Sequence, residues 1–175
     1  FKEIKEVPRS LIKLTYLEDL QLHGPEGSTI PEWIGELNSL KRLDLTYRTA
    51  SVIPESIGDL GNLEYLRIYG PHLKDIPDSI GNLKNLKVLW ISGETLENIP
   101  EGIGGLESLE ELHIGHTSIR SLPDSIGNLK NLKMLSLSEN KLESIPNTIA
   151  VKTNNNFISN NFLSFFHIDH NNEKA

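Results

Sequence analysis

The sequence predicts an α/β fold: a right-handed solenoid, or horseshoe, with a parallel concave β-sheet and short helical or 3₁₀ turns on its convex side. Three observations support this fold class. Seven prolines recur every 23 residues, apolar residues keep fixed columns in the same phase, and each unit contains a segment with the pattern LxxLxL. Self-similarity at a fixed period of this length is typical of chains whose units stack on their neighbours.

The proline column sets the phase of the repeat. It comprises Pro8, Pro31, Pro54, Pro77, Pro100, Pro123 and Pro146. Leu or Ile follows each proline after three residues, and glycine comes one position later in five units. Proline suits the first position of a helix, because that N–H needs no partner there. An acid follows proline in five units, where it meets the positive end of the helix dipole. We therefore expect a short helix or 3₁₀ turn after each proline, interrupted by its glycine.

The LxxLxL segments supply the strands. They span residues 17–22, 40–45, 63–68, 86–91, 109–114 and 132–137. Apolar and polar residues alternate at the centre of each segment, which predicts a half-buried strand. One unit cannot bury its apolar side alone, but stacked units can, with parallel strands about 4.8 Å apart.

With these motifs, the chain resembles the leucine-rich repeat family. The 23-residue unit with Ile/Leu-Pro-x-x-Ile-Gly-x-Leu is similar to the repeats of plant intracellular Ras-group proteins and of many bacterial repeat proteins. The resemblance covers about residues 4–149 and implies recognition of a macromolecular partner on the concave face. The chain departs from the family at the Asn of LxxLxLxxN, which only Asn140 provides. Its loops therefore need another way to satisfy their backbone groups.

The repeat also divides the chain. Residues 1–149 are expected to form the solenoid, with six full repeats after a partial N-terminal one. Residues 150–175 are expected to form a degenerate last repeat that acts as a C-terminal cap, followed by a frayed tail. A shift of 21 residues aligns Leu137 with Ile158, and a second register places Leu163 and Phe166 on the strand pattern. The alternative is a disordered Asn-rich tail.

Composition excludes several classes of function. The chain has 175 residues, 17 basic and 24 acidic, so its net charge is 17 − 24 = −7. This acidity argues against nucleic-acid binding, which depends on neutralising phosphates. There is no cysteine, no apolar run of 18 residues that would insert into a membrane, and no recognisable catalytic or phosphate-binding motif. We expect no enzyme activity and no cofactor. A cytoplasmic location is favoured over a secreted or host-delivered one.

Two groups of histidines have the residue types of a metal site. His167 and His170 flank Asp169, and His113 and His116 lie on and just past one predicted strand. Either pair could coordinate a metal, and the second could sense pH. Solvated surface histidines are the better interpretation of both, and no metal is expected.

One row of charges alternates in sign from unit to unit. It consists of Glu18, Lys41, Glu64, Lys87, Glu110 and Lys133. Cross-strand pairs of opposite charge stabilise a sheet. We interpret the row as a structural device that sets the stacking register.

The outward strand positions of the central units predict the binding surface. They collect aromatic and arginine residues, the types enriched at binding hot spots. The residues expected to contact a partner are Arg42, Asp44, Tyr47, Tyr65, Arg67, Tyr69, Trp90 and His113. The partner is expected to be a protein or peptide bound by a monomer. The same face could also serve as the recognition region of a larger signalling enzyme or ubiquitin-ligase effector, or of an adhesin or receptor ectodomain. Trp33 stands apart on the convex side, where it could pack against Tyr16 or the N-terminal turn, or mark a second contact.

Overall fold

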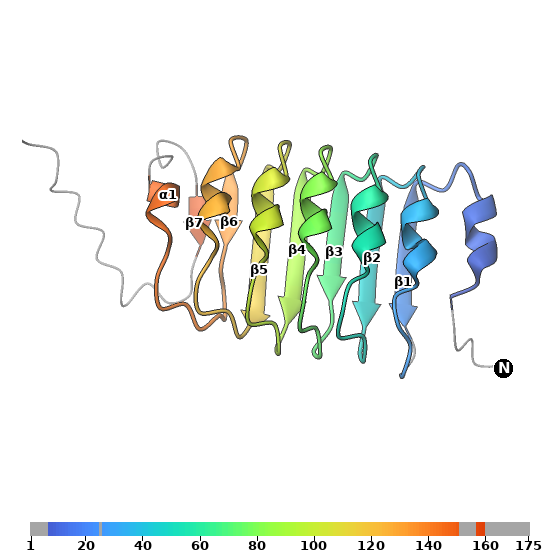
Figure 1. Cartoon of the computed structure of the whole chain (residues 1–175), viewed down its shortest axis with the longest axis horizontal. Coiled ribbons are helices and arrows are strands. Elements are labelled where there is room, and N and C mark those ends of the chain that lie inside the picture. The colour runs from blue at the N-terminus through green and yellow to red at the C-terminus, as the bar shows by residue number, and fades with distance from the viewer. Residues whose placement is uncertain (1–6, 25, 151–156, 160–175) are drawn as a thin grey trace, which may run out of the picture.

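The computed structural model of the chain describes residues 7–24, 26–150 and 157–159. Its strands form one sheet of seven, paired in sequence order and parallel throughout (Figure 1). The strands are β1 (Asp19–Gly24), β2 (Arg42–Tyr47), β3 (Tyr65–Tyr69), β4 (Val88–Gly93), β5 (Glu111–Thr117), β6 (Met134–Ser136) and β7 (Phe157–Ser159). The predicted solenoid is thus confirmed, with one strand from each successive unit.

A row of 3₁₀ turns covers one face of the sheet, in front of the strands in Figure 1. The turns are η1 (Arg9–Lys13), η2 (Glu32–Glu36), η3 (Glu55–Asp59), η4 (Asp78–Asn82), η5 (Glu101–Gly105) and η6 (Asp124–Asn128), and a short helix, α1 (Asn147–Ala150), follows. Each turn begins directly after a column proline, whose extended backbone brings the chain into the first turn. The carbonyl of that proline accepts the first hydrogen bond, as in Ile80 N to Pro77 O at 3.1 Å.

The core lies between the sheet and the turns. The inward leucines of the central strands, such as Leu66 and Leu89, are fully buried, and so are turn residues such as Ile57 and Ile80. Each rung packs only on the rungs before and after it, so the core is one continuous apolar column.

The glycine column exists because neighbouring turns approach each other closely. A Cβ added to Gly81 would lie 2.1 Å from the Gly102 carbonyl oxygen, and one added to Gly58 would lie 2.4 Å from that of Ser79. None of the five column glycines has a positive φ. The column therefore provides space between units and not conformational freedom.

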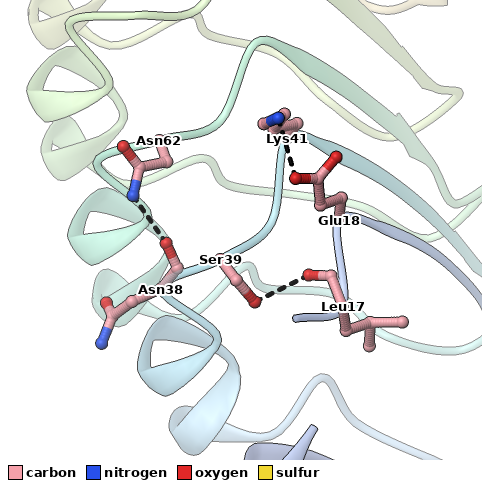
Figure 2. Close-up of polar contacts among 6 residues, drawn as sticks. All are labelled: Leu17, Glu18, Asn38, Ser39, Lys41 and Asn62. Carbon is pink, nitrogen blue, oxygen red and sulfur yellow. Dashed lines mark hydrogen bonds and ion pairs between the residues drawn. The ribbon is translucent and has the colours of Figure 1, made fainter. Parts of the chain in front are cut away.

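A column of polar residues lies just before each strand, at the opposite end of the strand from the Asn position of LxxLxLxxN. It consists of Ser39, Asn62, Asn85, Ser108 and Asn131. Asn62 donates its side-chain N–H to Asn38 O at 2.8 Å, and Ser39 donates its hydroxyl to Leu17 O at 2.8 Å (Figure 2). Asn85 and Asn131 repeat the Asn62 contact in later units. Loop carbonyls are thus satisfied from the following unit.

The alternating charge row forms three ion pairs between neighbouring units. Lys41 lies 2.8 Å from Glu18, Lys87 lies 2.6 Å from Glu64, and Lys133 lies 2.8 Å from Glu110. Glu18 raises the pKa of Lys41 by accepting its hydrogen bond, and Lys87 lowers the pKa of Glu64 by donating one. The side chains are exposed, so each pair contributes little to stability.

The last strand corrects the expected register of the C-terminal segment. Strand β7 pairs with β6 so that Leu135 faces Ile158, which preserves the 23-residue period in place of a 21-residue shift. Asn155 and Asn160 stand where this phase would have leucines, and so the period was hidden in the sequence. The second register, at residues 163–171, lies outside the described residues. The division into residues 1–149 and 150–175 stays a prediction.

Candidate functional site

The parallel register places outward side chains of successive units side by side on the face of the sheet that the turns leave open. We call this face the concave surface. One row runs Asp19, Arg42, Tyr65, Val88, Glu111 and Met134, and a second runs Gln21, Asp44, Arg67, Trp90, His113 and Ser136. The alternation that buries the leucines of each strand therefore exposes these two rows.

Both arginines of the surface are held by carboxylates of the preceding strand. Arg42 Nε lies 3.4 Å from Asp19 Oδ2, and its guanidinium carbon lies 4.1 Å from the centre of the Tyr65 ring. Arg67 Nη1 donates to Asp44 Oδ2 at 3.3 Å. Asp44 also accepts a hydrogen bond from the Thr46 hydroxyl at 3.1 Å. The ion pairs and the cation–π contact together orient both guanidinium groups.

Trp90 and His113 form a stacked pair on the adjacent strands β4 and β5. Their ring centres are 3.7 Å apart and their planes differ by 8°. His113 Nε2 lies 3.3 Å from Glu111 Oε2, so a polar contact at the edge of the imidazole also holds the ring. Trp90 remains 42% exposed, and Tyr69 on β3 remains 39% exposed. Two large aromatic rings thus face solvent at the centre of the concave surface, where no core packing explains them.

Tyr47 does not belong to this surface, and its inclusion was wrong. It ends β2 with its side chain turned into the core, where it is 2% exposed. Its ring fills the space that Gly24 leaves open, because a Cβ on Gly24 would lie 2.1 Å from it. Burial raises the pKa of Tyr47. Its position two residues after Leu45 continues the inward alternation, and that signal was available in the sequence.

The structure brings the other seven predicted residues together on β2 to β5. It adds two residues that the predicted site omitted, Asp19 and Glu111, which orient Arg42 and His113. The signal was present in the sequence, because Asp19 and Arg42 occupy the same column of successive units.

Trp33 and the charge row lie elsewhere. Trp33 is half-buried against the core, while Tyr16 is 93% exposed, so Tyr16 does not cover it. A groove of about 500 Å³ follows the charge row and the polar column before the strands. The polar groups that line it mostly bond to a neighbouring unit; Asn85, for example, donates to Gly61 O of the preceding unit at 2.7 Å. The residues that line this groove therefore serve to hold neighbouring units together.

Within residues 7–24, 26–150 and 157–159, no three His, Asp or Glu side chains gather as metal ligands would. His116 pairs with Glu139, with 2.7 Å between Nδ1 and Oε2. His167 and His170 lie outside the described residues. The same part of the chain contains no helix that is long and apolar enough to span a membrane.

Two family models match the chain. One, described as a leucine-rich repeat region, matches residues 34–118, and another, described as leucine-rich repeats in two copies, matches residues 107–150. No curated protein matches the chain in sequence.

Solved structures with the same fold include bacterial and plant proteins. A leucine-rich repeat protein from Leptospira interrogans is 25% identical, with a TM-score of 0.63, over 91% of this chain and 52% of its own. The plant peptide hormone receptor RGFR1, solved in complex with RGF2, is 29% identical, with a TM-score of 0.65, over 89% of this chain and 30% of its own. The leucine-rich repeat ectodomain of the Arabidopsis thaliana receptor kinase GASSHO1, solved with Casparian strip integrity factor 2, is 32% identical, with a TM-score of 0.61, over 78% of this chain and 17% of its own. The chain thus spans about half of the Leptospira protein and a smaller part of each receptor.

Proposed function

The chain belongs to the leucine-rich repeat family, and on that premise we propose that it is a non-catalytic module that binds a protein or peptide on its concave surface. The observation that carries the proposal is the cluster of Tyr65, Arg67, Tyr69 and Trp90 on the neighbouring strands β3 and β4. Tyr, Trp and Arg at the centre of a surface are the residues that most often dominate binding energy.

Two further observations support this proposal. The side chains of the concave surface are held in place before any partner arrives, by the Trp90–His113 stack and by the ion pairs of both arginines. A preorganised surface loses less conformational entropy on binding. The receptor structures similar to this chain were solved with bound partners, RGF2 in one case and Casparian strip integrity factor 2 in another.

The test compares two sets of substitutions in partner capture. The triple variant Tyr65→Ala, Arg67→Ala and Trp90→Ala removes the cluster. The matched variant Tyr16→Ala and Arg120→Ala removes an exposed aromatic ring and an exposed guanidinium away from this surface. Immobilised wild-type chain and both variants, checked for folding by circular dichroism, are used to capture proteins from a lysate of the source organism, with quantification by mass spectrometry.

We expect the matched variant to retain the proteins that the wild-type chain captures and the triple variant to lose them. Equal capture by all three chains would contradict binding on the concave surface.

A second proposal concerns the setting of the module. The chain covers only part of each similar protein, which favours a recognition region within a larger protein. The complete coding sequence tests this proposal. A signal peptide and membrane anchor would support a receptor or adhesin ectodomain, a flanking enzyme domain would support an effector, and a reading frame limited to these repeats would contradict both.

A further inference from the structure

We propose that the partner segment is acidic: a stretch of protein that brings a carboxylate to Arg42 and Arg67 and an aromatic or aliphatic side chain to Trp90. This inference rests on the proposed function and specifies the chemistry of the partner. It is carried by the order of the central ion pair, in which Arg67 is more exposed than Asp44, and by the donors that both arginines keep.

Each arginine contacts one carboxylate and keeps most of its donors, and Arg42 also lies over the Tyr65 ring. A guanidinium has five N–H groups. The contact of Arg42 with Asp19 engages Nε, and that of Arg67 with Asp44 engages Nη1. Both contacts, at 3.3–3.4 Å, are longer than a strong charge-assisted hydrogen bond. The remaining N–H groups are available for planar, two-point recognition of an incoming carboxylate, for which guanidinium is the best suited side chain.

In the ion pair of Arg67 and Asp44, the guanidinium is the more exposed group and the carboxylate lies beneath it. The Arg67 side chain is 48% exposed and that of Asp44 is 18% exposed. Asp44 is further held by the Thr46 hydroxyl. An approaching segment therefore meets the guanidinium first. An acidic segment is attracted to the exposed guanidinium, whereas a basic segment is repelled by its like charge.

The two guanidinium groups occupy adjacent positions on the surface. Arg42 is in register with Tyr65 and Arg67 is in register with Asp44, so the two arginines are diagonal neighbours on β2 and β3. Strand spacing and rise place the Cα atoms of such neighbours about 8 Å apart. One acidic side chain, or two on the same segment, can reach both.

The apolar contact lies next to these charges. Trp90 faces Arg67 directly across the β3–β4 pair. One face of its ring is stacked on His113, which holds the ring in place, and the side chain stays 42% exposed. A carboxylate at Arg67 would therefore bring its neighbouring side chain within reach of an exposed aromatic ring.

The experiment uses displayed peptide libraries as the probe. Three phage libraries of random 12-residue peptides carry a fixed central triplet: Glu-Trp-Glu, Gln-Trp-Gln or Lys-Trp-Lys. Each is selected on the immobilised full chain and sequenced before and after selection. One enriched peptide and its Glu→Gln analogue are then titrated by fluorescence anisotropy, at low and high salt, against the wild-type chain, Arg67→Gln, Arg42→Gln and Trp90→Ala. Arg120→Gln is the matched control, because Arg120 also pairs with a carboxylate, that of Glu143, but away from this surface.

We expect the acidic library to be retained at least ten-fold over the other two. Arg67→Gln and the Glu→Gln peptide should each weaken binding about ten-fold, the loss of one charge-assisted interaction, and Arg120→Gln should leave it unchanged. Binding should also weaken as salt rises.

The outcomes separate the two proposals. Equal or greater retention of the amide or lysine library, with loss of binding in Trp90→Ala but not in Arg67→Gln or Arg42→Gln, would overturn the acidic partner and leave the binding surface standing. Retention of none of the libraries, or peptide binding that Trp90→Ala does not change, would contradict the concave surface itself.

Discussion

Replacing Gly81 with alanine should destabilise the solenoid far more than the same change at Gly61. The added Cβ at position 81 would lie 2.1 Å from the Gly102 carbonyl oxygen, a backbone atom of the next unit. An ordinary contact is about 3.5 Å, so units η4 and η5 would have to separate by about 1.4 Å. The same Cβ at position 61 meets nothing within 4 Å.

The magnitudes follow from these distances. Forcing an extra methyl group into a closely packed site costs about 1–3 kcal/mol, and the backbone contact at Gly81 places this case at the upper end. Gly61→Ala should be neutral or stabilise the chain by about 0.4–1 kcal/mol, because alanine restricts the unfolded chain. At this chain length, each kcal/mol shifts Tm by about 2–4 °C.

Urea denaturation followed by circular dichroism, with thermal melts as a second measurement, compares the two variants with the wild-type chain. Equal m-values would show that the same unfolding transition is compared. If Gly81→Ala proved as stable as Gly61→Ala, the result would refute the view that the glycine column exists because backbones of neighbouring turns approach closely.

Three other predictions concern buried and paired groups. Tyr47→Phe should leave stability unchanged or raise it by about 1 kcal/mol, because the buried hydroxyl has no hydrogen-bond partner among the described residues. Burial raises the pKa of Tyr47 above its ordinary value, so the neutral phenol's contribution to stability is present below about pH 10 and is lost as pH rises further. In urea melts from pH 8 to 11, the free energy of unfolding should therefore fall less for Tyr47→Phe than for the wild-type chain. Asn140→Ala should lower the free energy of unfolding by about 2–3 kcal/mol in urea melts. The buried Asn140 side chain accepts a hydrogen bond from Thr117 Oγ1 at 2.6 Å and donates one to Ile114 O at 2.9 Å. The matched variant Asn128→Ala, at an exposed site, should lower it little. Lys87 lowers the pKa of Glu64, so the stability that this ion pair contributes is present above the ordinary glutamate pKa and is lost as pH falls through the lowered value. In Lys87→Gln, ¹³C NMR of the Glu64 carboxyl should show its pKa back in the ordinary range. An unchanged pKa would contradict the pairing.

The sequence predicted the concave surface well because strand alternation is strict. Once the leucines of β2 to β5 are assigned inward, residues such as Arg67 and Trp90 must face outward. Tyr47 was misassigned although the same rule places it inward, because it lies just beyond the LxxLxL segment and next to a cluster of aromatic and arginine residues. Its burial depends on Gly24 one unit earlier, a contact across 23 residues.

Contacts between units were harder to predict. The column of Ser39, Asn62 and Asn85 repeats as regularly as the prolines, yet its role depends on a carbonyl of the preceding unit coming within 2.7–2.8 Å. The register of β7 was hidden for a related reason, because only Ile158 in it keeps the leucine pattern and backbone pairing with β6 decides the alignment.

The order of residues by itself determined the period, the strands, the turns and the side of the sheet that faces outward, because these depend on chain geometry within one 23-residue unit. Only the tertiary structure decided which charges pair, why glycine is required between turns, and how Asp19 and Asp44 orient the two arginines. These features arise where one unit meets the next, at distances of a few ångströms that the sequence of a single unit does not contain.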